Sequence, residues 1–90
     1  MESLKFLKEV QQNGLHLQYG TYELRNNSEI VFEAVKQDPE ALQFASNNLQ
    51  SDKKIVLEAI RKKGSTLKYA SGFMKVQKSI VMEGSKKINF

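Results

Sequence analysis

Few side chains in this sequence have the chemistry that catalysis or metal binding needs. The 90 residues include one histidine, His16, and no cysteine. A zinc or redox-metal site needs several such ligands, and a lone histidine near the start of a helix is more typical of a surface or capping residue. The glycine patterns of phosphate loops, nucleophile elbows and dinucleotide-binding turns are also missing from the sequence. We therefore predict no catalytic residue, no cofactor and no metal ion.

The regularly spaced acidic residues favour a structural role over acid–base chemistry. Glu33, Glu58 and Glu83 follow one another at intervals of 25 residues. Each has a lysine or arginine three or four positions later, and this spacing forms ion pairs on a helix surface. We expect pairs such as Glu33 with Lys36 and Glu58 with Arg61.

Basic residues are the most conspicuous chemical feature of the chain, which has a net charge of +4. Residues 28–52 hold five acids and one base, whereas residues 53–77 hold seven bases and one acid. Such a charge excess attracts an acidic protein, nucleic-acid phosphates or an anionic membrane surface. The alternative is a solvated face that also attracts the acidic segment beside it. The predicted partner-binding basic patch consists of Lys53, Lys54, Arg61, Lys62, Lys63 and Lys68.

A 25-residue repeat positions these residues. Rows of 25 residues, written from residue 3, align without a gap, and apolar residues recur in the same columns. Such agreement is typical of a tandem repeat. We predict a single domain over residues 1–90, with units at 3–27, 28–52 and 53–77 and a partial unit at 78–90.

Each unit is predicted to contain two helices separated by a turn. Asp38 and Pro39 should end the first helix of the second unit, and Asp38 can also cap the helix that follows. Asn27 and Asp52 have suitable chemistry for the N-caps of two first helices. Helices this short need packing of unit on unit, so the predicted fold is all-α: helix-turn-helix repeats of period 25 in a small α-solenoid-like array.

The aromatic column of the repeat allows two interpretations. Tyr19, Phe44 and Tyr69 occupy it. The rings would either form a ladder on which a peptide or bases stack, or a wedge in the core between helix pairs with the hydroxyls directed outward.

Two segments in each of three units carry a family resemblance. They are Glu29–Gln37 with Ala41–Ser46, Lys54–Ile60 with Leu67–Ser71, and Val10–Leu15 with Leu17–Tyr19. These segments resemble the tandem helical repeat of the domain-of-unknown-function family 4116, and the similarity covers roughly residues 3–84. The family occurs in intracellular bacteria, protists and large viruses, sometimes inside secreted effectors, and has no known catalytic motif. The resemblance therefore implies a scaffold or partner-binding module and transfers no functional residue.

We predict that the chain is not an enzyme but a helical-repeat module that binds another protein. The alternative is nonspecific binding of nucleic acid or an anionic surface through the basic C-terminal half, and self-association through open repeat ends is a third option. Without a membrane-spanning run or a secretory leader, we expect a cytoplasmic protein, with export as an effector by another route left open. The variable columns expected to line one face are Gln11/Lys36/Arg61, Gln12/Gln37/Lys62 and Gln18/Gln43/Lys68.

Overall fold

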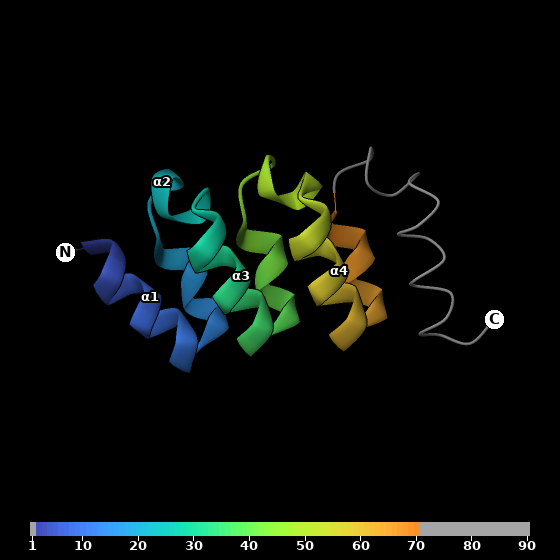
Figure 1. Ribbon diagram of the computed structural model, residues 1–90, viewed down its shortest axis with the longest axis horizontal. Coiled ribbons are helices and arrows are strands. Elements are labelled where there is room, and N and C mark those ends of the chain that lie inside the picture. Colours follow the sequence, from blue (N-terminus) through green and yellow to red (C-terminus); the bar gives the residue numbers. More distant parts are fainter. Residues whose placement is uncertain (1, 71–90) are drawn as a thin grey trace.

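The computed structural model describes residues 2–70. Within these residues, an α-helix followed by a short 3₁₀ helix occurs three times (Figure 1). No strand occurs in this part of the chain, and the predicted all-α class is confirmed. The α-helices are α1 (Glu2–Gln12), α3 (Ser28–Gln37) and α4 (Lys53–Lys62), and the 3₁₀ helices are η1 (Gly14–Tyr19), η2 (Pro39–Phe44) and η4 (Gly64–Tyr69).

The helical pairs are stacked in the order of the sequence. The α-helix α1 packs on α3 and α3 packs on α4, while η1 packs on η2 and η2 on η4, so that two layers run along the array (Figure 1). Two short elements, α2 (Tyr22–Arg25) and η3 (Leu49–Ser51), lead from one pair to the next. We refer to residues 3–27, 28–52 and 53–77 as units 1, 2 and 3. The predicted partial unit 78–90, with Glu83, lies outside the described residues.

Local hydrogen bonds explain where the helices begin and end. Asn27 and Asp52 each accept a hydrogen bond from the backbone N–H three residues later, at 3.1 and 3.2 Å. Asp38 has two roles, because its backbone N–H closes the end of α3 while its carboxylate accepts from the N–H of Glu40 at 2.9 Å. These are the caps that the sequence predicted.

The second helix of each unit is shorter and tighter than predicted. Leu42, Ala45 and Leu49 have the spacing of one apolar helix face, but η2 ends at Phe44 and Leu49 belongs to η3. The backbone N–H of Ala45 bonds to the carbonyl of Leu42, which is the spacing of a 3₁₀ helix. Ala45 then adopts an extended conformation that stops the helix. All three side chains are nevertheless buried.

The core follows the repeat columns through the stack. Val10, Val35 and Ile60 share one column and are fully buried. Unit 1 departs from this pattern at the outer end of the array, where Lys5 and Glu9 stand in columns that hold isoleucine and alanine in the other units. Lys5 is exposed there, as expected for a helix that meets solvent.

Candidate partner-binding surface

The bases of α4 lie at both ends of one helix. Lys53 and Lys54 form its first turn, and Arg61 and Lys62 form its last turn. All four side chains are exposed. Lys54 and Arg61 are seven residues apart and therefore lie on the same helix face. We call these four residues the α4 surface.

Helix stability does not explain the bases at the beginning of α4. The N-terminus of a helix carries partial positive charge, so a lysine there is unfavourable by a few tenths of a kcal/mol and an acidic residue is favourable. The corresponding turn of α3 contains Glu29, whereas α4 has Lys53 and Lys54. Lys53 has no ion-pair partner among residues 2–70. The charge of Lys53 is therefore directed to solvent, whereas the ammonium of Lys54 contacts the Phe32 ring of α3.

Lys63, in contrast, is used to join two units. Its Nζ lies 2.8 Å from Oε2 of Glu40, and the hydroxyl of Tyr69 donates to Oε1 of the same carboxylate at 2.6 Å. Glu40 belongs to η2, while Tyr69 ends η4. For this member of the basic patch, the interpretation as attraction between an acidic and a basic unit is therefore correct.

The three side chains shift one another's pKa in consistent directions. The hydrogen bond from Lys63, followed by that from Tyr69, lowers the pKa of Glu40 below its ordinary value of 4.5. The hydrogen bond to Glu40 raises the pKa of Lys63 above 10.5 and that of Tyr69 above 10.0. The carboxylate is thus held as an anion between a cation and a neutral phenol.

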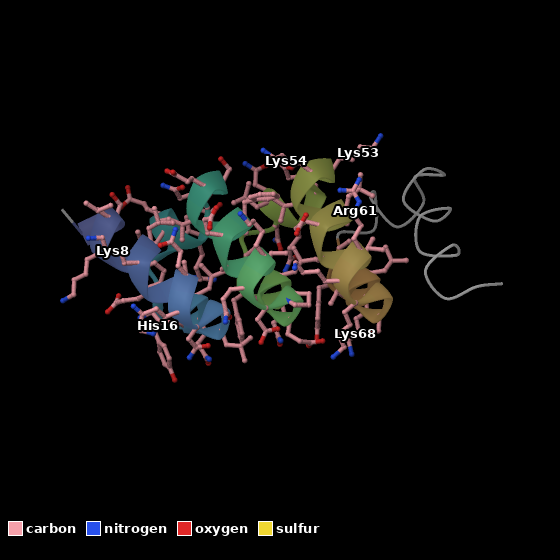
Figure 2. The ribbon with its side chains drawn as sticks, turned by 60° about the horizontal axis from the view of Figure 1, so that its bottom comes forward. Lys8, His16, Lys53, Lys54, Arg61 and Lys68 are labelled. Carbon is pink, nitrogen blue, oxygen red and sulfur yellow. The ribbon has the colours of Figure 1, made fainter. Side chains whose placement is uncertain are left out.

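The remaining member of the predicted patch, Lys68, is separated from the α4 surface. Its Nζ lies 5.2 Å from the ring centroid of Tyr69, in a cation–π contact. In Figure 2, Lys68 projects from the opposite edge of the molecule to Lys53 and Arg61. The structure therefore divides the six predicted bases into the α4 surface, a bridging Lys63 and a separate Lys68.

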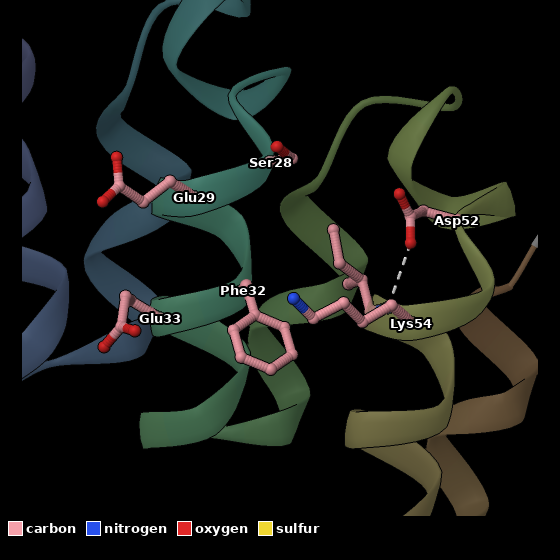
Figure 3. A pocket seen from close by; sticks show the side chains of 7 residues that line it. Ser28, Glu29, Phe32, Glu33, Asp52 and Lys54 are labelled. Carbon is pink, nitrogen blue, oxygen red and sulfur yellow. Dashed lines mark hydrogen bonds between the residues drawn. The ribbon is translucent and has the colours of Figure 1, made fainter.

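Lys54 also reaches across to unit 2. Its Nζ lies 4.7 Å from the ring centroid of Phe32 on α3, and the Nζ of Lys36 lies 5.7 Å from the same centroid. A groove of about 320 Å³ opens between α3 and α4 at this point (Figure 3). We call it the Phe32 groove; its lining consists of Ser28, Glu29, Phe32, Glu33, Asp52, Lys54 and Ile55.

The acidic column behaves only partly as predicted. Glu33 pairs with Lys36 at 3.5 Å and also accepts from the amide of Gln11 on α1 at 3.5 Å. Glu58 forms no ion pair with Lys62 within residues 2–70. Two members of one repeat column therefore differ in their partners.

The aromatic column is divided in the same way. Phe44 and Tyr69 pack against the core, as the wedge interpretation predicts. Tyr19 at the end of the array is 73% exposed, and its ring lies 5.4 Å from that of His16, which in turn is 5.2 Å from Phe6. The only histidine therefore packs between two rings in tilted contacts, and its Nε2 lies 3.4 Å from Oε1 of Glu9. No group of three or more potential metal ligands occurs within residues 2–70.

The variable columns are directed outward. All nine of their residues, including Gln11, Gln43 and Lys62, are exposed. In addition, no helix in the described part of the chain is long and apolar enough to cross a membrane.

Two features of the surface were not found by sequence reasoning. One is the role of Glu40 as an acceptor for two side chains of unit 3. The other is the Phe32 groove. Phe32 did carry a signal, because it is the only aromatic residue in a column that otherwise holds Leu7, Leu57 and Met82. Glu40 carried none, because its partners are 23 and 29 residues away.

Comparisons with known proteins address the family. No curated protein and no solved structure matches the chain. The sequence model of the family described as Domain of unknown function (DUF4116) matches residues 4–50 and, in a second overlapping match, residues 27–75. Two overlapping matches suggest that the family unit is repeated. Because they span most of the 90 residues, the chain belongs to the DUF4116 family.

Proposed function

We propose that the chain is a non-catalytic helical-repeat module that binds an acidic protein partner through the α4 surface. The observation that carries this proposal is the pair of lysines in the first turn of α4, where exposed bases do not favour the helix. Stacked repeats present their variable columns as an extended surface, and these columns are exposed here.

Charge reversal at Lys53 and Lys54 tests the proposal. Glutamate at both positions favours the helix N-terminus, so the double variant should fold at least as well as the wild type. Proteins captured from a lysate by the wild-type chain should be depleted about tenfold or more on the double variant. Quantitative mass spectrometry after cross-linking provides the measurement.

Lys8→Glu is the matched control, because Lys8 is an exposed base on α1. It should leave the captured proteins unchanged. A capture profile that is the same for wild type, the control and the double variant would show that the α4 surface does not bind the partner.

Nucleic acid or an anionic membrane surface is the second candidate, favoured by two exposed bases of α4, Lys53 and Lys62, that have no ion pair within residues 2–70. Such binding should be nonspecific and should weaken steeply with salt. Mixed-sequence DNA, RNA and phosphatidylserine vesicles at low salt provide the probes. If none of them binds, this candidate is excluded and the protein-binding proposal stands.

A further inference from the structure

We propose that Asn13 is a site of spontaneous deamidation, and that the packing of unit 1 on unit 2 protects it from this reaction. The side chain of Asn13 is exposed, and the next residue is a glycine. The inference concerns a chemical modification of the chain and does not depend on the partner-binding proposal. It implies that an opening of the joint between these two units leaves a lasting change in unit 1.

The reaction needs no enzyme and no co-reactant other than water. The backbone nitrogen of Gly14 loses its proton and attacks Cγ of Asn13, so that a C–N bond forms and a cyclic imide closes. The bond from Cγ to the side-chain nitrogen breaks, and this nitrogen takes up the proton and leaves as ammonia. Water then opens the imide at either of its carbonyls, which yields aspartate or isoaspartate.

A glycine after the asparagine is the feature that permits this attack. Glycine has no Cβ beside the attacking nitrogen, and its backbone readily adopts the conformations that ring closure requires. The corresponding pair in unit 2 is Asp38–Pro39, in which the proline nitrogen carries no proton to lose. In unit 3 the pair is Lys63–Gly64, which offers no side-chain amide. Among the three turns, only that of unit 1 has both reacting groups.

The packed joint opposes ring closure in three ways. The N–H of Gly14 donates to Oε1 of Gln37 in unit 2 at 2.6 Å, so the attacking nitrogen is held with its proton in place. The ψ angle of 100° at Asn13 turns its Cβ away from that nitrogen. The side-chain oxygen of Asn13 also accepts from the N–H of Leu15 at 3.1 Å, which keeps the amide in its capping position.

These restraints are released only when unit 1 moves away from α3. Gly14 is buried so closely against α3 that a Cβ at this position would collide with the backbone carbonyl of Ala34. The rotation that brings Cγ of Asn13 to the glycine nitrogen therefore needs space that the packed units do not provide. Local opening of one part of a protein costs less free energy than global unfolding, and such opening sets the rate of the reaction.

The two products differ in their effect on the joint. Aspartate retains the capping chemistry, as Asp38 shows at the start of η2. Isoaspartate instead routes the backbone through the side-chain carbons of residue 13 and so adds a methylene group to the chain. This extra group shifts Gly14 from its contact with Ala34, so the isoaspartate form should not pack again as before. Formation of isoaspartate would thus make the opening permanent.

Deamidation rates measured by mass spectrometry test the proposal. Each conversion raises the mass by one unit, and a protease that cleaves before aspartate but not before isoaspartate distinguishes the products. A synthetic peptide of residues 9–18 gives the rate without packing. At the same neutral pH and temperature, the full chain should react at Asn13 about tenfold or more slowly than the peptide, because the reaction requires opening. In concentrated urea the two rates should agree. Asn26 and Asn47, each followed by another asparagine, are internal controls and should react more slowly there.

Variants at position 37 isolate the hydrogen bond. Gln37→Lys removes the acceptor and should raise the rate at Asn13 by about fivefold to thirtyfold, because the loss of a partly buried hydrogen bond favours the open joint. Gln37→Glu retains an acceptor and should react nearly as slowly as the wild type. Lys62→Gln, in the same repeat column of unit 3, is the matched control and should have no effect. Circular dichroism establishes that each variant is folded.

Three results would overturn the proposal. A peptide of residues 9–18 that stays unmodified would show that Asn13 is not a deamidation site. A full chain that reacts as fast as the peptide would show that the joint gives no protection. Equal rates for folded Gln37→Lys and Gln37→Glu would show that the hydrogen bond to Gly14 does not control the reaction. If Gln37→Lys does not fold, the comparison of the wild-type chain with the peptide still decides whether the joint protects Asn13.

Discussion

The joint between units 1 and 2 and the joint between units 2 and 3 use different polar contacts around similar apolar columns. In the first joint the contacts are neutral at the turn: the N–H of Gly14 donates to Oε1 of Gln37 at 2.6 Å. Gly14 also packs so closely that a Cβ at this position would collide with the carbonyl of Ala34. In the second joint an ion pair between Lys63 and Glu40 takes the leading role.

A proline explains part of this difference. Pro39 occupies the position of Gly14 in the next unit and has no N–H to donate. Lys62 of unit 3 occupies the same repeat column as Gln37 of unit 2. Because Pro39 has no N–H, no hydrogen-bond acceptor is needed at Lys62. In the first joint, the side chain of Gln37 accepts a hydrogen bond from the N–H of Gly14. In the second joint, proline offers no such N–H, and the residue in the same variable column is a base, Lys62.

Filling the space at the first joint should destabilise the fold more than any other change considered below. Gly14→Ala should lower the free energy of unfolding by about 2–3 kcal/mol, because the added methyl meets backbone atoms that cannot rotate away. Urea unfolding followed by circular dichroism measures this loss. Ser65→Ala, at an exposed position of η4, is the control and should change little. Equal stabilities of the two variants would show that the first joint is looser than described.

Exchanging the polar residues of the two joints should have a smaller effect. Gln37→Lys should cost about 1–2 kcal/mol, since the N–H of Gly14 loses its acceptor in a partly buried place. The matched change Lys62→Gln should be nearly neutral, because Pro39 has no N–H. If both substitutions cost the same, the hydrogen bond to Gly14 does not distinguish the joints.

The smallest effect is expected at the charged joint, where the groups are exposed to solvent and screened. Glu40→Gln should lower the unfolding midpoint modestly at neutral pH. The wild type loses the contribution of Glu40 as the pH falls below 4.5 through its lowered pKa. The contributions of Lys63 and Tyr69, whose pKa values are raised, are present below 10.0 and disappear at higher pH. The difference between wild type and variant should therefore be largest between about pH 6 and 9. A difference that does not change with pH would contradict the ion pair as its source.

Periodicity predicted the parts of the fold that depend on apolar burial and caps. The columns of Val10 and Ile30, the caps at Asn27 and Asp52, and the end of α3 before Pro39 all follow from local chemistry. The sequence could not distinguish an α-helix from a 3₁₀ helix in the second half of a unit, because six residues are too few to show a period.

The surface was harder to predict than the fold. The sequence marked six bases, but their separation depends on the directions of side chains from two layers, which no periodic pattern contains. Lys63 does not belong to the α4 surface because it is paired with Glu40. Lys68 does not belong to it because it projects from the opposite edge of the molecule (Figure 2). Lys54 was among the predicted bases, but its contact with Phe32 requires the neighbouring unit.

The use of Lys63 as a bridge also has a consequence for local motion. Asn13 and Asp38 cap η1 and η2 with their side chains, whereas Lys63 at the corresponding position makes no such bond. The first amides of η4 are therefore held less firmly than those of η1 and η2, and hydrogen exchange should be faster at Ser65 than at Leu15 or Glu40. Opening of η4 would disturb the contact between Lys63 and Glu40. A partner that orders η4 would therefore also stabilise the packing of unit 3 on unit 2.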